Sequence, residues 1–294
     1  MLPSAEPVKN ALTIDLEDYY QVTAFASDSG ASDWKSHASR VEANTAKLLE
    51  LLSLAKCRAT FFTLGWVAEK YPKLIRQIAE LGHEIGCHSH LHRLVYSLTP
   101  GEFKEDTRRA KELLEDASGV TVRGYRAPSF SITRDSWWAF EVLAALGFAY
   151  DSSLFPIKHM NYGMPNGPRF PFQVQTPAGP VAEFPMPTVA LGSARSPFGG
   201  GAYFRLLPYR FTRWGIGYVN RRENQPVCVY LHPWELDSDQ PRMQGSLTSR
   251  ARHYFGLKAT EAKLKRLLSE FEFHPLATVL GELKLSDVEV PTLA

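Results

Sequence analysis

The sequence predicts an α/β protein built on a parallel sheet, either open or closed into a barrel, and two patterns lead to that prediction. Short apolar runs alternate with amphipathic helical patterns through the first half of the 294-residue chain. Polar residues of the kinds used in catalysis follow directly after several of those runs. Repeated strand–helix units favour parallel strands, and active sites of such folds form at the carboxyl ends of the strands.

The strands are expected where apolar, β-branched and aromatic residues form short runs. In the first half these runs are 11–14, 58–64, 83–87, 120–125 and 148–150. A further strand is expected at 227–231, and residues 276–280 are the candidate for the last one.

The helices are expected where apolar residues recur every three or four positions. These segments are 41–55, 72–81, 100–118, 137–146 and about 260–271. Thr99-Pro100-Gly101-Glu102 has the form of a capping box with proline at the first helical position, and Gly119 is the expected stop of that helix.

The pattern changes between Pro156 and Pro208, where ten of the twenty prolines lie and no helical period is visible. Phe170, Phe172 and Phe184 in this stretch need burial. The sequence therefore predicts a loop-rich or irregular β insertion.

The bulk properties exclude some functions. Hydrophobic residues make up 44% and charged residues 22%, and the formal net charge is +2, so nucleic-acid binding has no electrostatic support. No window approaches the ~18 uninterrupted apolar residues of a membrane span, and Met1 to Pro7 carries no visible secretory signal. Cys57, Cys87 and Cys228 fit buried reduced thiols, which indicates a cytoplasmic protein.

Three histidines occupy five positions in Gly86-Cys87-His88-Ser89-His90-Leu91-His92. One helical turn would put His88 and His92 on the same face. Two imidazoles with one carboxylate make a three-ligand site that keeps a position open for water, which is typical of catalytic zinc. His90 is not expected to bind, because its spacing from the other two requires strand geometry. The segment indicates a metal-dependent hydrolase.

Other polar residues follow the expected strands. They are Asp15, Glu17, Asp18, Arg126, Asp151 and His232. A parallel sheet would bring all of these strand ends to one edge.

With these residues in this order, the chain resembles the polysaccharide deacetylase superfamily, the family-four carbohydrate esterases with a NodB-homology domain. Five motifs carry the resemblance, in the family's order. They are Asp15-Leu16-Glu17-Asp18, His88-Ser89-His90-Leu91-His92, Arg126-Ala127-Pro128, Asp151-Ser152-Ser153 and Leu231-His232.

The resemblance implies a distorted parallel (β/α) barrel of about seven strands within one domain, residues 1–294. Its core would be about 10–155 and 226–285, with a proline-rich irregular insertion at about 156–225. The implied activity is metal-assisted removal of an N-acetyl group from an amino sugar of a polysaccharide or its precursor.

A subgroup is also indicated. The form Asp-x-Glu-Asp-Tyr, together with Gly199-Gly200-Gly201-Ala202-Tyr203-Phe204-Arg205, resembles deacetylases encoded beside exopolysaccharide and exosortase loci. The departure from the usual acidic motif leaves the carboxylate ligand open. Strand alternation favours Glu17, whereas a turn would present Asp18.

The resemblance also implies roles. Asp15 would be the base, oriented by Arg126, and His232 would be the acid, with Asp151 orienting it or raising its pKa. The metal ligands would be His88, His92 and Glu17 or Asp18. Tyr203, Phe204 and Arg205 would form one wall of a sugar site, and Trp234 would be packing or a further sugar contact.

Zinc is the expected ion, although two histidines and a carboxylate also suit iron. The expected partner is an N-acetylated glycan, and the oligomeric state stays open. Three alternatives remain. They are an allantoinase-like hydrolase of cyclic amides or ureides, an amidohydrolase barrel, and a catalytically inactive glycan-binding module. The amidohydrolase is disfavoured because its His-x-His follows the first strand, where this chain has carboxylates.

Overall fold

The computed structural model describes residues 8–25, 30–159, 162–192 and 194–288. Residues 1–7, on which the expectation about a secretory signal depends, lie outside the described residues. The strands are β1 (Asn10–Leu16), β2 (Thr60–Thr63), β3 (Glu84–Cys87), β4 (Gly124–Tyr125), β5 (Tyr150–Asp151), β6 (Phe172–Val174), β7 (Val181–Glu183), β8 (Thr188–Leu191), β9 (Ala194–Pro197), β10 (Cys228–Leu231), β11 (Phe273–His274) and β12 (Asp287–Val288).

The helices alternate with the strands in the first half of the chain and cluster near its end. They are α1 (Val41–Leu54), α2 (Gly65–Lys70), α3 (Pro72–Glu80), α4 (Pro100–Ser118), α5 (Ala139–Ala145), α6 (Gly201–Leu206), α7 (Tyr209–Tyr218), α8 (Leu247–Tyr254), α9 (Leu257–Glu270) and α10 (Leu276–Gly281). Among the described helices, none combines the length and apolar character needed to cross a lipid bilayer.

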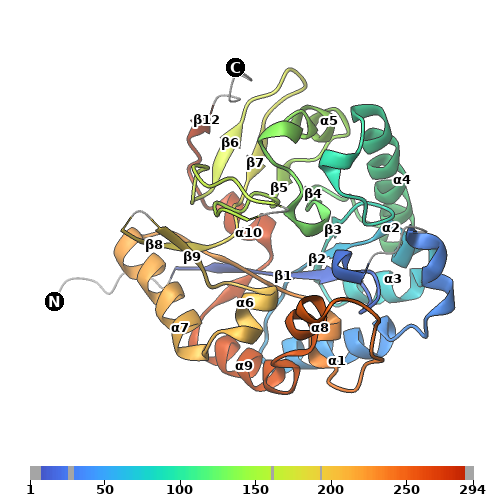
Figure 1. Ribbon diagram of the computed structural model, residues 1–294. Helices are drawn as coiled ribbons and strands as arrows, with labels where there is room; N and C mark the ends of the chain where they lie inside the picture. The colour runs from blue at the N-terminus through green and yellow to red at the C-terminus, as the bar shows by residue number, and fades with distance from the viewer. Residues whose placement is uncertain (1–7, 26–29, 160–161, 193, 289–294) are drawn as a thin grey trace.

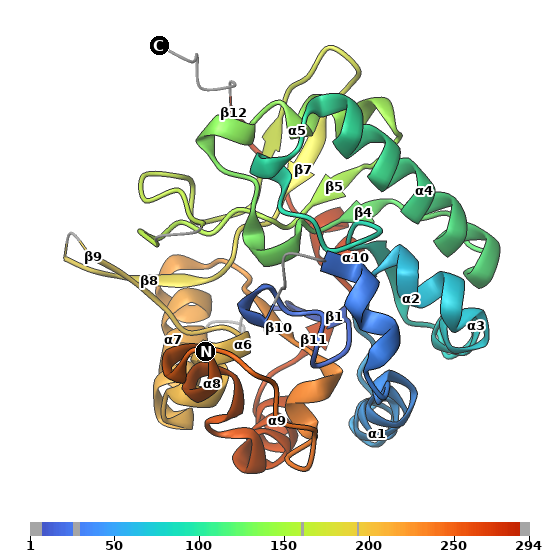
Figure 2. The same ribbon diagram turned by 45° about the vertical axis from the view of Figure 1, so that its right-hand side comes forward.

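Seven neighbouring strands run parallel, in the order β10, β1, β2, β3, β4, β5 and β7. β6 joins β7 in antiparallel pairing, and β12 extends that edge. At the other edge, Gly199 accepts a hydrogen bond from the amide of Tyr230 in β10. The strands curve and the longer helices lie around their outside (Figures 1 and 2). The predicted α/β fold, a distorted parallel barrel, is confirmed.

Two apolar clusters sit on the two faces of the sheet. Alternate residues of β1, Leu12 and Ile14, pack outward against the helices, whereas Ala11 faces the barrel interior. Helix α10 fills that interior at the amino-terminal end of the strands. Its first amide, Leu276 N, donates to the hydroxyl of Thr60 at the start of β2 (2.7 Å). Full burial of a leucine side chain, as at Leu12 and Leu276, stabilises the fold by about 1.5–3 kcal/mol.

Helix α4 forms as its sequence predicts. Thr99 accepts a hydrogen bond from the Glu102 amide, and the Glu102 side chain accepts one from the Thr99 amide, which completes the capping box. Gly119 ends the helix in the left-handed conformation, with φ of 75°. The cysteines at 57, 87 and 228 are free and buried, as expected.

Two expectations were wrong. Residues 276–280 form helix α10, because the strand position beside β1 is taken by Phe273 and His274. The expected insertion is also more regular than predicted. Its strand β7 continues the parallel sheet beside β5, and helices α6 and α7 fill much of residues 201–218.

Candidate active site

The acidic residues at the end of β1 point into the mouth of the barrel. Alternation along the strand puts Thr13, Asp15 and Glu17 on the inner side, opposite Leu12 and Ile14. Asp15 and Glu17 are both buried, although each carries a carboxylate. Buried carboxylates need charged or hydrogen-bonding partners, and both have them here.

Glu17, His88 and His92 form a cluster suited to a metal ion. One ligand atom from each lies within 4.8 Å of the others. Nδ1 of His88 lies 2.8 Å from the carbonyl oxygen of Arg126. A carbonyl can only accept, so Nδ1 carries the proton and Nε2 keeps its lone pair for the cluster.

The donors of this cluster fit a cation. Oε2 of Glu17 lies 3.0 Å from Nε2 of His92, yet this buried oxygen accepts no well-oriented hydrogen bond within the described residues. Such an oxygen is costly unless a cation satisfies it. Burial raises the pKa of Glu17, but its interactions with the neighbouring histidines, above all His92, outweigh this effect and lower it overall. Burial also lowers the pKa of His88 to about 3, so its imidazole is neutral.

The two histidines reach the cluster from a loop. Ser89 and His92 have φ of 63° and 53°, and Ser89 Oγ accepts a hydrogen bond from the His92 amide (3.0 Å). These left-handed residues turn the chain back on itself. The prediction that a helical turn aligns His88 and His92 was therefore wrong about the backbone.

Asp18 lies outside the cluster. Its Oδ2 accepts hydrogen bonds from Ser39 Oγ, the Arg40 amide and the Val41 amide, and its Oδ1 accepts one from the Tyr19 amide. These bonds hold the start of helix α1. Of the two candidate carboxylate ligands, only Glu17 faces the histidines, as strand alternation favours.

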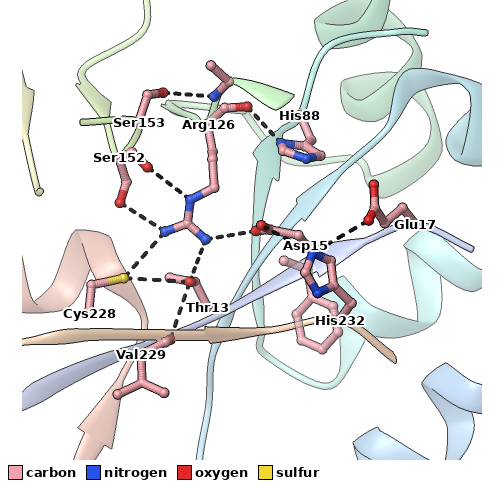
Figure 3. Close-up of polar contacts among 12 residues, drawn as sticks. Thr13, Asp15, Glu17, His88, Arg126, Ser152, Ser153, Cys228, Val229 and His232 are labelled. Carbon is pink, nitrogen blue, oxygen red and sulfur yellow. Dashed lines mark hydrogen bonds and ion pairs between the residues drawn. The ribbon is translucent and has the colours of Figure 1, made fainter. Parts of the chain in front are cut away.

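Asp15 pairs with a buried arginine at the centre of the site (Figure 3). Nη1 of Arg126 lies 2.7 Å from Asp15 Oδ1 and donates to it, and donates also to Thr13 Oγ1. The other nitrogens of Arg126 donate to Ser152 and Cys228. A guanidinium held at so many points fixes the orientation of the carboxylate.

His232 follows β10 and faces the same space. Its Nε2 lies 3.5 Å from Glu17 Oε1 and 3.9 Å from Asp15 Oδ2, and its Nδ1 is hydrogen-bonded to Glu235 Oε1 (2.9 Å). Burial lowers the pKa of His232, but the Glu235 hydrogen bond and the charges of Glu17, Glu235 and Asp15 raise it to about 9.

The expectation that Asp151 orients His232 was wrong. Alternation along β5 turns Tyr150 and Ser152 inward, so Asp151 points to the opposite side of the sheet. There it interacts with Ser153 and with Glu183. Burial and the charge of Asp151 raise the pKa of Glu183 well above its usual value.

The carboxylate that supports His232 is Glu235, which sequence reasoning missed. Pro233 opens a 3-10 turn (Pro233–Leu236), and this turn brings position 235 back over the ring of the preceding histidine. The signal was present as an acidic residue three positions after the histidine, with proline between them.

A pocket of about 370 Å³ surrounds these groups. Its wall comes from seven parts of the described chain. The lining residues are Asp15, Glu17, Val22, Thr23, Ala24, His88, His92, Leu94, Tyr96, Ser129, Phe130, His159, Tyr162, Ala202, Arg205, Tyr230, His232, Trp234, Glu235, Thr248, Ser249, Arg252 and His253.

Of the three residues predicted to form one wall of a sugar site, only one lines this pocket. Arg205 lines it, whereas Phe204 is packed in the core and Tyr203 lies behind the lining. Trp234 is buried, stacks on His232 (5.0 Å between ring centroids) and lies with Nε1 3.5 Å from Glu17 Oε1. Its contacts are those of a residue that positions the site and not those of an open sugar platform.

The glycine triplet serves packing against β10. A Cβ at Gly200 or Gly201 would lie 2.3 or 2.4 Å from atoms of Tyr230, and Gly201 has φ of +49°. The group that approaches this triplet closely is therefore the ring of Tyr230.

Residues 24–150 match the family model of polysaccharide deacetylase, and residues 152–281 match a domain of unknown function (DUF3473). Over 118 residues the chain is 30% identical to a peptidoglycan deacetylase of Helicobacter pylori. This alignment covers 38% of this chain and 38% of the relative. Over 98 residues it is 33% identical to a peptidoglycan-N-acetylglucosamine deacetylase of Bacillus cereus, which covers 33% of this chain and 36% of that one.

The matched part of the chain spans less than two fifths of the length of either curated relative. A crystal structure of a Mycobacterium smegmatis protein assigned to the polysaccharide deacetylases aligns with 99% of this chain and 97% of its own, at a TM-score of 0.59 and 19% identity. That likeness concerns the fold alone. From the family match and these relatives, residues 24–150 form a polysaccharide deacetylase domain.

Proposed function

We propose that this chain is a metal-dependent hydrolase that removes N-acetyl groups from an amino sugar of a polysaccharide or its precursor. One observation carries the proposal: a metal-suited cluster, a candidate base and a candidate acid face one pocket. They are the cluster Glu17, His88 and His92, the pair Asp15 and Arg126, and the pair His232 and Glu235.

The ion would be held by Glu17, His88 and His92. Two neutral imidazoles and a carboxylate suit zinc, and they also suit iron and other divalent ions. When bound, such an ion lowers the pKa of water and polarises a carbonyl oxygen.

Asp15 is the proposed general base. It accepts the proton of the attacking water while Arg126 holds its Oδ1. Its Oδ2 makes no hydrogen bond to Arg126 and faces His232 across 3.9 Å, which leaves that oxygen for the reacting water.

His232 is the proposed general acid. A raised pKa keeps it protonated near neutral pH, and its Nε2 faces the space shared with Asp15 and Glu17. From there it donates a proton to the departing amine of the sugar. Glu235 binds Nδ1, which fixes the ring and stabilises its charge.

Acetate release from N-acetylglucosamine oligosaccharides tests the proposal. We expect purified protein, loaded with zinc, to release acetate, and Asp15→Asn to lower the rate by at least about 100-fold while retaining the metal. Asp116→Asn is the control, because this exposed aspartate lies on α4, outside the pocket.

The same assay separates the alternatives. Turnover of a cyclic ureide without acetate release from glycans would replace the proposal by the allantoinase-like reading. Glycan binding without turnover of either substrate, in protein that carries its metal, would favour an inactive binding module. Equal activity of Asp15→Asn and wild type would refute the role of Asp15.

A further inference from the structure

One wall of the pocket carries a cation that the proposed chemistry does not use. Helix α8 lies beside α6 at the mouth of the barrel (Figure 2) and contributes Thr248, Ser249 and Arg252 to the lining. Positions 248, 249 and 252 share one face of a helix. Arg252 and two hydroxyl-bearing residues therefore line the pocket together, and both of those hydroxyls contact Ser246 Oγ at the start of the helix.

Arg252 has no carboxylate partner among the described residues. Within the part of the chain that the structure describes, its guanidinium makes one hydrogen bond, from Nη2 to the hydroxyl of Tyr162 at 3.1 Å. The hydroxyls of Tyr162, Tyr203 and Tyr230 are near enough to act on it electrostatically, and none of these groups is a carboxylate. Most of its five N–H donors therefore have no partner among residues 8–25, 30–159, 162–192 and 194–288.

The other arginines of the site contrast with Arg252. Arg126 donates to Asp15 and to several neighbours, as described above. Arg205 donates from Nη1 to the carbonyl oxygens of Arg252, His253 and Phe255, and its Nε lies 3.4 Å from Glu235. Each of these two guanidinium groups is committed to a carboxylate of the protein, whereas that of Arg252 is not.

The charges of the pocket indicate what this cation meets. Asp15 pairs with Arg126, Glu235 pairs with Arg205, and Glu17 belongs to the metal cluster. A divalent ion bound by that cluster would give the pocket more positive than negative charge. Arg252 adds a further positive charge to the pocket. Such a pocket attracts anions.

We propose that Arg252, with Ser249 and Thr248, binds an anionic group on the glycan, so that the substrate is an acidic polysaccharide with a carboxylate or phosphate near the N-acetylated sugar. This inference rests on the proposed function for the reaction but concerns binding alone. Planar guanidinium groups bind both kinds of oxyanion through paired hydrogen bonds. Arg252 is a specificity residue in this view and does not touch the acetyl group.

Matched oligosaccharides test the inference. Binding to the Asp15→Asn protein and turnover by the active protein are measured with chitotetraose, with a tetrasaccharide that alternates uronate and N-acetylglucosamine, and with N-acetylglucosamine 1-phosphate. We expect one of the two acidic ligands to be preferred over chitotetraose, and the pair distinguishes carboxylate from phosphate. Arg252→Met should reduce that preference by about 10- to 100-fold, and Arg252→Lys should reduce it less.

Arg250→Met is the matched control, because Arg250 is an exposed arginine of the same helix that does not line the pocket. An unchanged preference in Arg252→Met, or none in wild type, would overturn the inference while glycan deacetylation stands. Acidic glycan bound through Arg252 without turnover would support the inference and count against the proposed reaction. Neither binding nor turnover of any of the glycans would overturn both.

Discussion

Two adjacent carboxylates, Glu17 and Asp18, are expected to respond in opposite ways to the same isosteric change. Glu17→Gln should remove metal binding and leave the fold intact. Asp18→Asn should keep the metal and destabilise the fold. The contrast follows from their contacts, since Glu17 faces His88 and His92 whereas Asp18 holds the start of α1.

The magnitude for Asp18→Asn follows from its hydrogen bonds. Four donors point at its two oxygens, and three of them are backbone amides: Tyr19, Arg40 and Val41. An asparagine amide can be turned either way, but each orientation sets its NH₂ against at least one of these amides. A buried donor left unsatisfied costs about 1–3 kcal/mol, and lost charge at a helix start adds about 0.3–1 kcal/mol.

A loss of about 2–4 kcal/mol should lower the melting temperature of a chain of this size by about 4–8 °C. For Glu17→Gln the expected change in the metal-free protein is below about 1 kcal/mol, because a neutral amide is easier to bury than a carboxylate. The amount of bound zinc in Glu17→Gln should fall from about one ion per chain to a small fraction, since a neutral amide is a weak ligand for zinc.

Elemental analysis after dialysis against zinc, and thermal unfolding of chelator-treated protein, measure the two effects separately. The reasoning fails if Asp18→Asn loses its metal at an unchanged melting temperature, or if Glu17→Gln keeps about one ion per chain.

Two further changes test the surroundings of the site. Glu235→Gln should lower kcat by about 10- to 100-fold with no loss of metal, because it weakens the partner that orients His232; steady-state kinetics with metal analysis would contradict this role if kcat stayed within about twofold. Glu183→Gln should gain stability relative to wild type as the pH rises from 5 to 8. The folded Glu183 carboxyl keeps its proton above the usual pKa of 4.5, so the folded state binds more protons than the unfolded one and wild-type stability falls with rising pH. Urea unfolding at both pH values should show a relative shift of more than about 1 kcal/mol, and parallel stability curves would refute the buried proton.

Features fixed by local chemistry were predictable from the sequence. Helix α4 carries its own start and stop signals, Thr99 with Glu102 and Gly119, and it forms between them. Segment 276–280 shows the opposite case. A five-residue apolar run fits a buried strand or a buried helix equally well. What decides between them is that Phe273 and His274 already pair with the first residues of β1, and this pairing depends on tertiary structure.

The site likewise contains residues that the sequence could predict and residues that it could not. Alternation along a strand favoured Glu17 over Asp18, and the same rule applied to β5 would have turned Asp151 away from His232 once Ser152 faced inward. Two residues contact the ring of His232 and also lie close to it in the sequence. They are Glu235 and Trp234. Arg252 could not be assigned to the site from sequence, because only the packing of α8 brings it to the pocket.

On β1 and β10 the inner face changes from apolar to charged along the strand, and this gradient helps to explain how the fold tolerates its buried charges. On β10, Cys228 and Tyr230 face inward before His232 is reached, and on β1 Ala11 precedes Asp15 in the same way. The apolar end is closed by α10, so the stabilising contacts of the interior are separated from the polar mouth. Charges at the mouth remain open to a substrate and an ion, and they cost the fold less there than they would beside α10.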